Sequence, residues 1–226
     1  FGGLGITKLG TNALTLDQAN TYTGGTTVSG GTLNVNHDHA LGNSGTITLT
    51  SGTIDNTSGA AITNSVANPI TIGGNFAFGG TNDLNLGAGA VTNGGSRTIT
   101  LNGTGSTLTL DGVMTNTANA VQTTTVNGAG NTLVLGGCAL SNNATSRVDV
   151  INGTGNVTIT GPITNGGTAT TSGLNYSGSG TLTLSGDNTY GGATTVGANG
   201  RLYVNGTHTP ASSVATTYSR SEERRV

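Results

Sequence analysis

Asn102-Gly-Thr-Gly105 is the first of four similar glycine turns, and Asn127-Gly-Ala-Gly130, Asn152-Gly-Thr-Gly155 and Ser177-Gly-Ser-Gly180 follow it. The turns begin at positions 102, 127, 152 and 177, so the interval from each turn to the next is constant. A short run of β-forming residues, such as Thr107-Leu-Thr-Leu110, comes after each turn. A fixed period of roughly 20–50 residues indicates stacked repeats, none of which buries its apolar face alone.

Apolar residues alternate with threonine in these runs, which is typical of half-buried strands. Each unit contains three short runs separated by turns and one longer loop. We therefore predict an all-β protein that folds as a parallel β-helix, or β-solenoid, with about 25 residues per coil. Similar but looser spacing upstream, as in Phe76-Ala-Phe78, extends the prediction to a single β-helix segment over residues 1–209.

The composition excludes several classes of protein. The 226 residues include 41 Gly and no Trp, and 7% are charged, which is far from the usage of an ordinary globular domain. A net charge of −2 gives no reason to expect binding to nucleic acid or to anionic membranes. Because no apolar run approaches about 18 residues, we predict no transmembrane segment in this chain.

The two ends of the chain differ from the rest. The last seven residues, Arg220-Ser-Glu-Glu-Arg-Arg-Val226, include five charged side chains and differ in composition from the rest, and we interpret residues 210–226 as a disordered or artefactual tail. The chain begins at Phe1 without an initiator methionine. We expect it to be an internal segment of a longer protein.

Aligning the units by their turns places similar residues in columns. The residue before each turn is bulky and apolar, so we expect this column to point into the coil: Leu101, Val126, Ile151 and Tyr176. Two residues upstream, Asp149 breaks the pattern. Either it is paired within the coil or its strand slips in register, and we predict that it faces water because a lone buried carboxylate is costly. The asparagines that open the turns, at 102, 127 and 152, predict a stacked amide ladder at one corner.

A sharper pattern occurs near both ends. Asn20-Thr-Tyr-Thr-Gly-Gly-Thr-Thr-Val28 precedes Gly31-Thr-Leu-Asn-Val35, and Asn188-Thr-Tyr-Gly-Gly-Ala-Thr-Thr-Val196 precedes Gly200-Arg-Leu-Tyr-Val204. This pattern resembles the autotransporter-associated β-strand repeat, also called the passenger-associated transport repeat. The second copy departs from it between Gly191 and Ala193 and at Arg201.

The resemblance implies a right-handed β-helix in the passenger of a bacterial autotransporter, displayed at the surface of a Gram-negative cell or secreted. It implies export through a C-terminal outer-membrane β-barrel of the parent chain, a surface ligand or host matrix as partner, no cofactor and no catalytic residue. We interpret the motif residues as structural, and expect each tyrosine to pack over its turn with its hydroxyl in solvent. These residues are Asn20, Tyr22, Gly24, Gly25, Asn188, Tyr190, Gly191 and Gly192.

Few other residues suggest chemistry. His37-Asp38-His39 is the most metal-like cluster. Adjacent strand positions face opposite ways, although His37 and His39 could share one face, and with no further ligand nearby we expect a solvated loop and no metal site. Cys138 is the only cysteine and is expected to be a small buried hydrophobe. We expect His208 to lie at the surface.

Two alternative functions compete with that of a structural or adhesive passenger. A polysaccharide-acting enzyme needs paired carboxylates, whereas Arg97 and Arg147 share a column without one and Asp17, Asp111 and Asp187 sit at turns. We therefore expect no catalysis. An ice- or surface-binding solenoid needs one flat threonine rank. The Thr-x-Thr triplets fall on several kinds of strand, so we predict no single uninterrupted rank.

Overall fold

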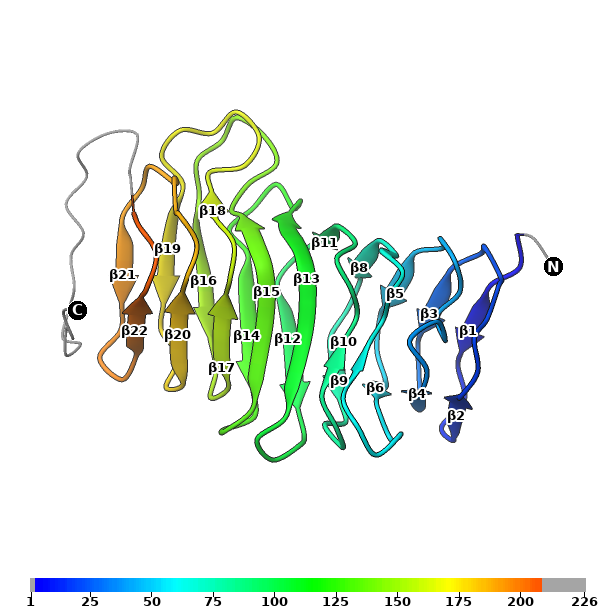
Figure 1. Cartoon of the computed structure of the whole chain (residues 1–226). Helices are drawn as coiled ribbons and strands as arrows, with labels where there is room; N and C mark the ends of the chain where they lie inside the picture. The colour runs from blue at the N-terminus through cyan, green and yellow to red at the C-terminus, as the bar shows by residue number, and fades with distance from the viewer. Residues whose placement is uncertain (1–2, 209–226) are drawn as a thin grey trace.

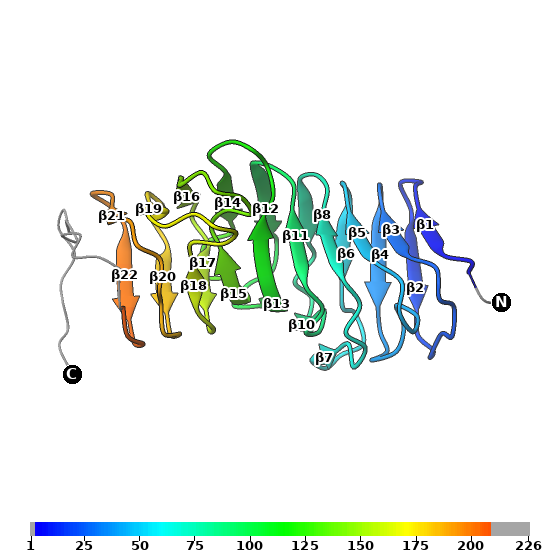
Figure 2. The same cartoon turned by 90° about the horizontal axis from the view of Figure 1, so that it is seen from above.

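The computed structural model describes residues 3–208, which form a parallel β-solenoid of about nine turns with roughly 23 residues per turn. Figures 1 and 2 show the turns following one another along a single axis, from the N-terminal to the C-terminal end. No helix occurs between residues 3 and 208, and the strands there pair in parallel. The predicted all-β solenoid is confirmed. The predicted tail at 210–226 lies outside the described residues.

The strands form two sheets that run the length of the stack. The nine-stranded sheet has the order β2 (Ala13–Leu16), β4 (Thr32–Val35), β6 (Thr53–Asp55), β9 (Phe76–Phe78), β12 (Arg97–Leu101), β14 (Thr123–Asn127), β16 (Val148–Asn152), β19 (Gly173–Tyr176) and β21 (Thr194–Val196). The main path of the thirteen-stranded sheet is β1 (Ile6–Lys8), β3 (Thr26–Val28), β5 (Ile47–Leu49), β8 (Ile70–Ile72), β11 (Val91–Asn93), β13 (Thr107–Asn116), β15 (Thr132–Ala139), β17 (Asn156–Ile159), β20 (Thr181–Leu184) and β22 (Arg201–Val204). Three further strands branch from it: β7 (Ile62–Thr63), β10 (Leu84–Asn85) and β18 (Ile163–Thr164).

The long strand β13 divides the thirteen-stranded sheet into two faces. Its first half pairs Leu108 with Leu84 of β10, and its second half pairs Met114 with Val91 of β11. We call the face of β7, β10, the first halves of β13 and β15, β17, β20 and β22 the Leu108 face. The face of β1, β3, β5, β8, β11, the second halves of β13 and β15, and β18 is the Thr71 face. With the nine-stranded sheet, these two faces enclose the interior.

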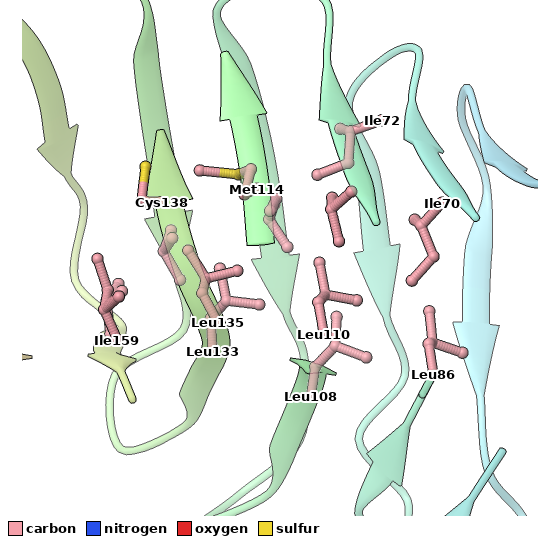
Figure 3. Close-up of a cluster of buried hydrophobic side chains, with 14 of the residues drawn as sticks. Ile70, Ile72, Leu86, Leu108, Leu110, Met114, Leu133, Leu135, Cys138 and Ile159 are labelled. Atoms are coloured by element: carbon pink, nitrogen blue, oxygen red, sulfur yellow. The ribbon is translucent and has the colours of Figure 1, made fainter. Parts of the chain in front are cut away.

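The interior is filled by aliphatic side chains that alternate with outward residues along each strand. Leu108 pairs with Leu133, and Leu133 pairs with Val157, so one turn packs against the next. Figure 3 shows part of this cluster, and the leucines labelled in it are at most 1% exposed. Cys138 belongs to it at 2% exposed, and burial raises the pKa of its thiol to about 12. The prediction of a buried hydrophobic cysteine is confirmed.

The interior column is also confirmed, although its register differs from the repeat. Leu101, Val126, Ile151 and Tyr176 are all at most 5% exposed. Thr98 pairs with Thr125, where the spacing of the turns would give Thr123, so Val126 lies beside Ile99 instead of Leu101. A slip of two positions leaves every side chain on its own face, because strand side chains alternate with a period of two. The slip also places Asn127 beside Thr100 and Asn152 beside Thr125, so the predicted ladder of turn asparagines is wrong.

A different polar ladder lies in the interior, and it corrects the prediction for Asp149. This residue is 2% exposed. Its carboxylate accepts hydrogen bonds from Nδ2 of Asn116 at 2.7 Å and from the backbone N–H of Gln122 at 2.8 Å. Asn116 in turn accepts one from Nδ2 of Asn93 at 3.1 Å. Donors from the preceding turn thus supply what water would supply outside, so Asp149 is paired within the coil. Burial raises the pKa of Asp149, against the opposing effect of these hydrogen bonds.

One corner of the solenoid, between the Leu108 and Thr71 faces, is a column of glycines. A Cβ atom built at Gly112 would lie 1.9 Å from the carbonyl oxygen of Gly89, and one at Gly136 would lie 1.7 Å from that of Asp111. The same approach recurs at Gly161, where the distance to the oxygen of Gly136 is 2.0 Å. Only a hydrogen atom fits there, so glycine is required at this corner for steric reasons.

Candidate functional site

The asparagine of the terminal motif bonds to the following turn in both copies. In the first copy, Asn20 donates its backbone N–H to the carbonyl of His39 at 3.0 Å and its Nδ2 to that of Ala40 at 2.9 Å. In the second, Asn188 donates its backbone N–H to the carbonyl of Thr207 at 2.8 Å. Oδ1 of Asn188 also accepts the N–H of Ile163 at 2.9 Å, so this side chain contacts the turn before as well.

The motif tyrosines form the same short-range contact in both copies. The hydroxyl of Tyr22 is hydrogen bonded to Oγ1 of Thr26 at 2.6 Å, and that of Tyr190 to Oγ1 of Thr194. Tyr190 is fully buried, with its ring edge-on to that of His208 at a centroid distance of 4.5 Å. The expectation of hydroxyls in solvent is therefore wrong, because each phenol takes a partner from its own turn. Tyr22, which is half-buried, also donates to the carbonyl of Ala40 in the following turn at 3.3 Å.

His208 is half-buried against Tyr190 and not simply a surface residue. Burial lowers its pKa, and a hydrogen bond with the backbone of Tyr190 opposes this effect.

The paired glycines of the motif lie where two turns approach most closely. Gly24 donates its N–H to the carbonyl of Leu4 at 3.1 Å, and Gly192 donates to that of Ser172 at 2.8 Å. A Cβ at Gly25 would lie 2.7 Å from the carbonyl oxygen of Thr46, and one at Gly191 2.1 Å from that of Thr170. In both copies the glycines thus allow backbone-to-backbone contact between neighbouring turns.

The two copies occupy different faces of the solenoid. In the first copy, β2 and β4 belong to the nine-stranded sheet and β3 to the Thr71 face. In the second, β21 belongs to the nine-stranded sheet, while β20 and β22 belong to the Leu108 face. Leu14 pairs with Leu33 and Leu182 pairs with Leu202, so both copies make turns shorter than the average of the solenoid. The motif therefore specifies how one turn folds locally, and it does not specify which outer face that turn occupies.

The Thr71 face carries a feature that the sequence analysis missed. Six threonines lie in register on consecutive strands: Thr7, Thr27, Thr48, Thr71, Thr92 and Thr115. Ala139 and Thr164 continue the row. Ile70 and Ile72, on either side of Thr71, are each 1% exposed, so Thr71 points outward. The prediction of no uninterrupted rank is wrong, because the rank uses one residue from each strand and is invisible in triplets read along a strand.

The arginines and turn aspartates are engaged in polar contacts with nearby residues. Arg97 donates to the carbonyl of Ser96 at 3.0 Å, and Arg147 donates to Oδ1 of Asn119. Asp111 accepts Nδ2 of Asn85 at 2.6 Å, and Asp187 accepts the hydroxyl of Thr207 at 2.8 Å. The contacts of Arg147, Asp111 and Asp187 tie neighbouring turns together. They do not include the pair of facing carboxyl groups that glycoside cleavage uses.

His37, Asp38 and His39 lie in the turn that follows β4 and not on a strand. Their neighbouring side chains therefore converge, and Oδ1 of Asp38 lies 2.9 Å from Nδ1 of His37 and 3.0 Å from Nδ1 of His39. This convergence is what strand alternation argued against.

Among residues 3–208, no helix is long and apolar enough to cross a membrane.

Comparison with known proteins bears on the two motif segments. Residues 6–35 and 174–204 match the family described as passenger-associated-transport-repeat. These ranges include β1 to β4, β19 except its first residue, and β20 to β22, and with them every motif residue described above. Neither the curated proteins nor the solved structures gave a match. The chain is thus a parallel β-solenoid that carries passenger-associated transport repeats, the repeats of autotransporter passengers, in its first and last described turns.

Proposed function

We propose that this chain is a structural or adhesive segment of a bacterial autotransporter passenger, displayed at the cell surface or secreted, with repeats that support folding and export. The observation that carries the proposal is the equivalence of the two matched segments. Asn20 and Asn188 bond to the following turn, and Tyr22 and Tyr190 bond within their own, although the copies lie on different faces. These contacts are the same in both copies although the copies lie on different outer faces. We therefore infer that they stabilise the backbone and do not bind a ligand.

The same contacts suggest how the motif assists export. In a solenoid, each turn gains its stability from its neighbours, so folding can propagate one turn at a time. Asn20 and Asn188 each connect their own turn to the one that follows it in the chain. A motif turn that has folded outside the cell would therefore bond to the next turn as it emerges. This bonding would oppose backward movement of the chain into the cell.

Surface display of motif variants tests this proposal. The chain is expressed as the passenger of an autotransporter in a Gram-negative host, with Asn20→Ala and Asn188→Ala combined. We expect reduced display at unchanged synthesis, because each substitution removes side-chain hydrogen bonds to neighbouring turns that contribute about 1 kcal/mol apiece. Asn20 loses its bond to Ala40, and Asn188 loses its bonds to Ile163 and Thr207, whereas the backbone bonds remain. The matched control is Asn142→Ala, since Asn142 is exposed in a loop. Display equal to that of the control would refute a role of the motif in export.

The row of threonines favours a second candidate function, which is binding to a flat, regular surface such as ice. Threonine presents a methyl group and a hydroxyl together, and the row repeats at the strand spacing of about 4.8 Å. Lys8 is the one charged residue in the described strands of the Thr71 face. It is 7% exposed, and its ammonium donates to the carbonyls of Gly10 and Gly30. The face is therefore regular and nearly without charge.

Thr71→Tyr tests the second candidate, because a large side chain in the middle of the row would hold a flat ligand away from it. We expect most of any ice-recrystallisation inhibition to be lost, with little change in stability since Thr71 points outward. Thr158→Tyr is the matched control, because Thr158 points outward between two buried residues on the Leu108 face. Absence of inhibition by the unaltered chain, or equal loss in both variants, would eliminate this candidate.

A further inference from the structure

The turn after β4 brings together three side chains that can bind a metal ion. The donor atoms of His37, Asp38 and His39 all lie within 4.8 Å of one another. Oδ1 of Asp38 is the central atom, at 2.9 Å and 3.0 Å from the two Nδ1 atoms. Each side chain is partly exposed, between 37% and 51%, so an ion in solution has access to all three.

The backbone of this turn is held in place by the turns on both sides. The carbonyl of Asp38 accepts the N–H of Ser65 at 2.9 Å. The carbonyls of His39 and Ala40 accept the backbone N–H and the Nδ2 of Asn20 at 3.0 Å and 2.9 Å. Three consecutive carbonyls are thus fixed from outside the turn. Donors on such a backbone lose little conformational freedom when they bind an ion, which favours affinity.

Two acceptor atoms of the cluster lie close together. Nδ1 of His37 accepts the backbone N–H of His39 at 3.0 Å, so this nitrogen carries its lone pair. The same nitrogen lies 2.9 Å from Oδ1 of Asp38, which also offers a lone pair. Two acceptors at this distance repel each other unless a cation lies between them.

The separations of the donor atoms indicate which ions fit. Nitrogen and oxygen donors bind transition metals at about 2.1 Å. Two donors 2.9 Å apart and about 2.1 Å from the same ion subtend an angle of about 90° at it. A tetrahedral site would instead hold such donors about 3.4 Å apart. Right angles between nitrogen and oxygen ligands are typical of tetragonal Cu²⁺ and Ni²⁺ sites.

We propose that His37, Asp38 and His39 form a surface site for a tetragonal divalent ion, Cu²⁺ or Ni²⁺, with the remaining positions taken by water. The site lies on the turn that Asn20 bonds to, so the bound ion also reinforces the contact between the first repeat and its successor. This follows from linkage, because an ion that binds only the folded turn stabilises it.

Titration of the full chain, purified without a histidine tag, tests the site. We expect one Cu²⁺ per chain by calorimetry, with affinity falling in the order Cu²⁺, Ni²⁺, Zn²⁺. Electron paramagnetic resonance of the Cu²⁺ complex should show coupling to two imidazole nitrogens, and this readout needs no variant. His37→Ala and His39→Ala should each abolish tight binding, whereas His208→Gln, which alters the remaining histidine, should leave it unchanged.

Three results would overturn the proposal. The first is the absence of stoichiometric Cu²⁺ binding to the unaltered chain. The second is binding that persists in the combined His37→Ala and His39→Ala variant. The third is Zn²⁺ affinity equal to that of Cu²⁺, which would contradict the right-angled arrangement of the donors.

Discussion

Gly136→Ala is expected to destabilise the solenoid by about 3 kcal/mol, the upper end of the usual cost of overpacking. The new Cβ would lie 1.7 Å from the carbonyl oxygen of Asp111 in the preceding turn. That oxygen belongs to the backbone, so no side-chain rotation relieves the clash. β13 and β15 pair on both sides of this corner, and they would have to separate there.

Urea unfolding followed by circular dichroism measures this effect. The matched control is Gly10→Ala, because a Cβ built at Gly10 meets nothing within 4 Å. The control should unfold at nearly the same urea concentration as the unaltered chain. If both variants unfold together, close contact at the glycine corner does not limit stability.

Asp149→Ala is expected to cost about 2–5 kcal/mol, because it leaves two buried donors without a partner at about 1–3 kcal/mol each. These donors are Nδ2 of Asn116 and the backbone N–H of Gln122. Asp111→Ala is the matched control, since Asp111 is exposed and accepts a single bond from Asn85. The control should lose less than about 1 kcal/mol. Equal losses in the two variants would show that the interior ladder contributes little.

Asp149→Asn separates the charge of this residue from its hydrogen bonds. The amide retains an oxygen for Gln122, and Oδ1 of Asn93 has no partner in the structure, so the ladder can reverse its direction. Burial raises the folded-state pKa of Asp149 above 3.8, so folding favours the protonated acid. The contribution of Asp149 to stability is therefore complete below pH 3.8 and decreases as the pH rises through the folded-state pKa.

The asparagine variant lacks this loss, so its stability relative to the unaltered chain should increase with pH. Unfolding in urea at several values between about pH 3 and pH 7 measures the difference. If the free energies of unfolding of the two chains change in parallel with pH, the carboxyl group has the same pKa in the folded and unfolded chains.

Much of the fold could be predicted because strand alternation is local. Leu108 and Leu110 point inward since every second side chain of a strand lies on one face. The recurring glycine turns predicted stacked coils, and the Asn20 and Asn188 segments predicted the family match at both ends. The contacts of the motif could not be predicted in the same way. We expected the tyrosine hydroxyls to lie in water, but they are hydrogen bonded to Thr26 and Thr194. Nothing in the spacing of the motif shows that these threonines lie within reach.

The sequence by itself determined the in-and-out pattern of each strand, the glycine turns and the presence of the repeat. Tertiary structure alone decided which residue lies beside which in the next turn. That choice depends on the length of each closed turn, which is short where Ala13 pairs with Thr32 and long where Thr98 pairs with Thr125. The partners of Asp149, the row through Thr71 and the meeting of His37 with Asp38 and His39 all arise from how the turns close and stack.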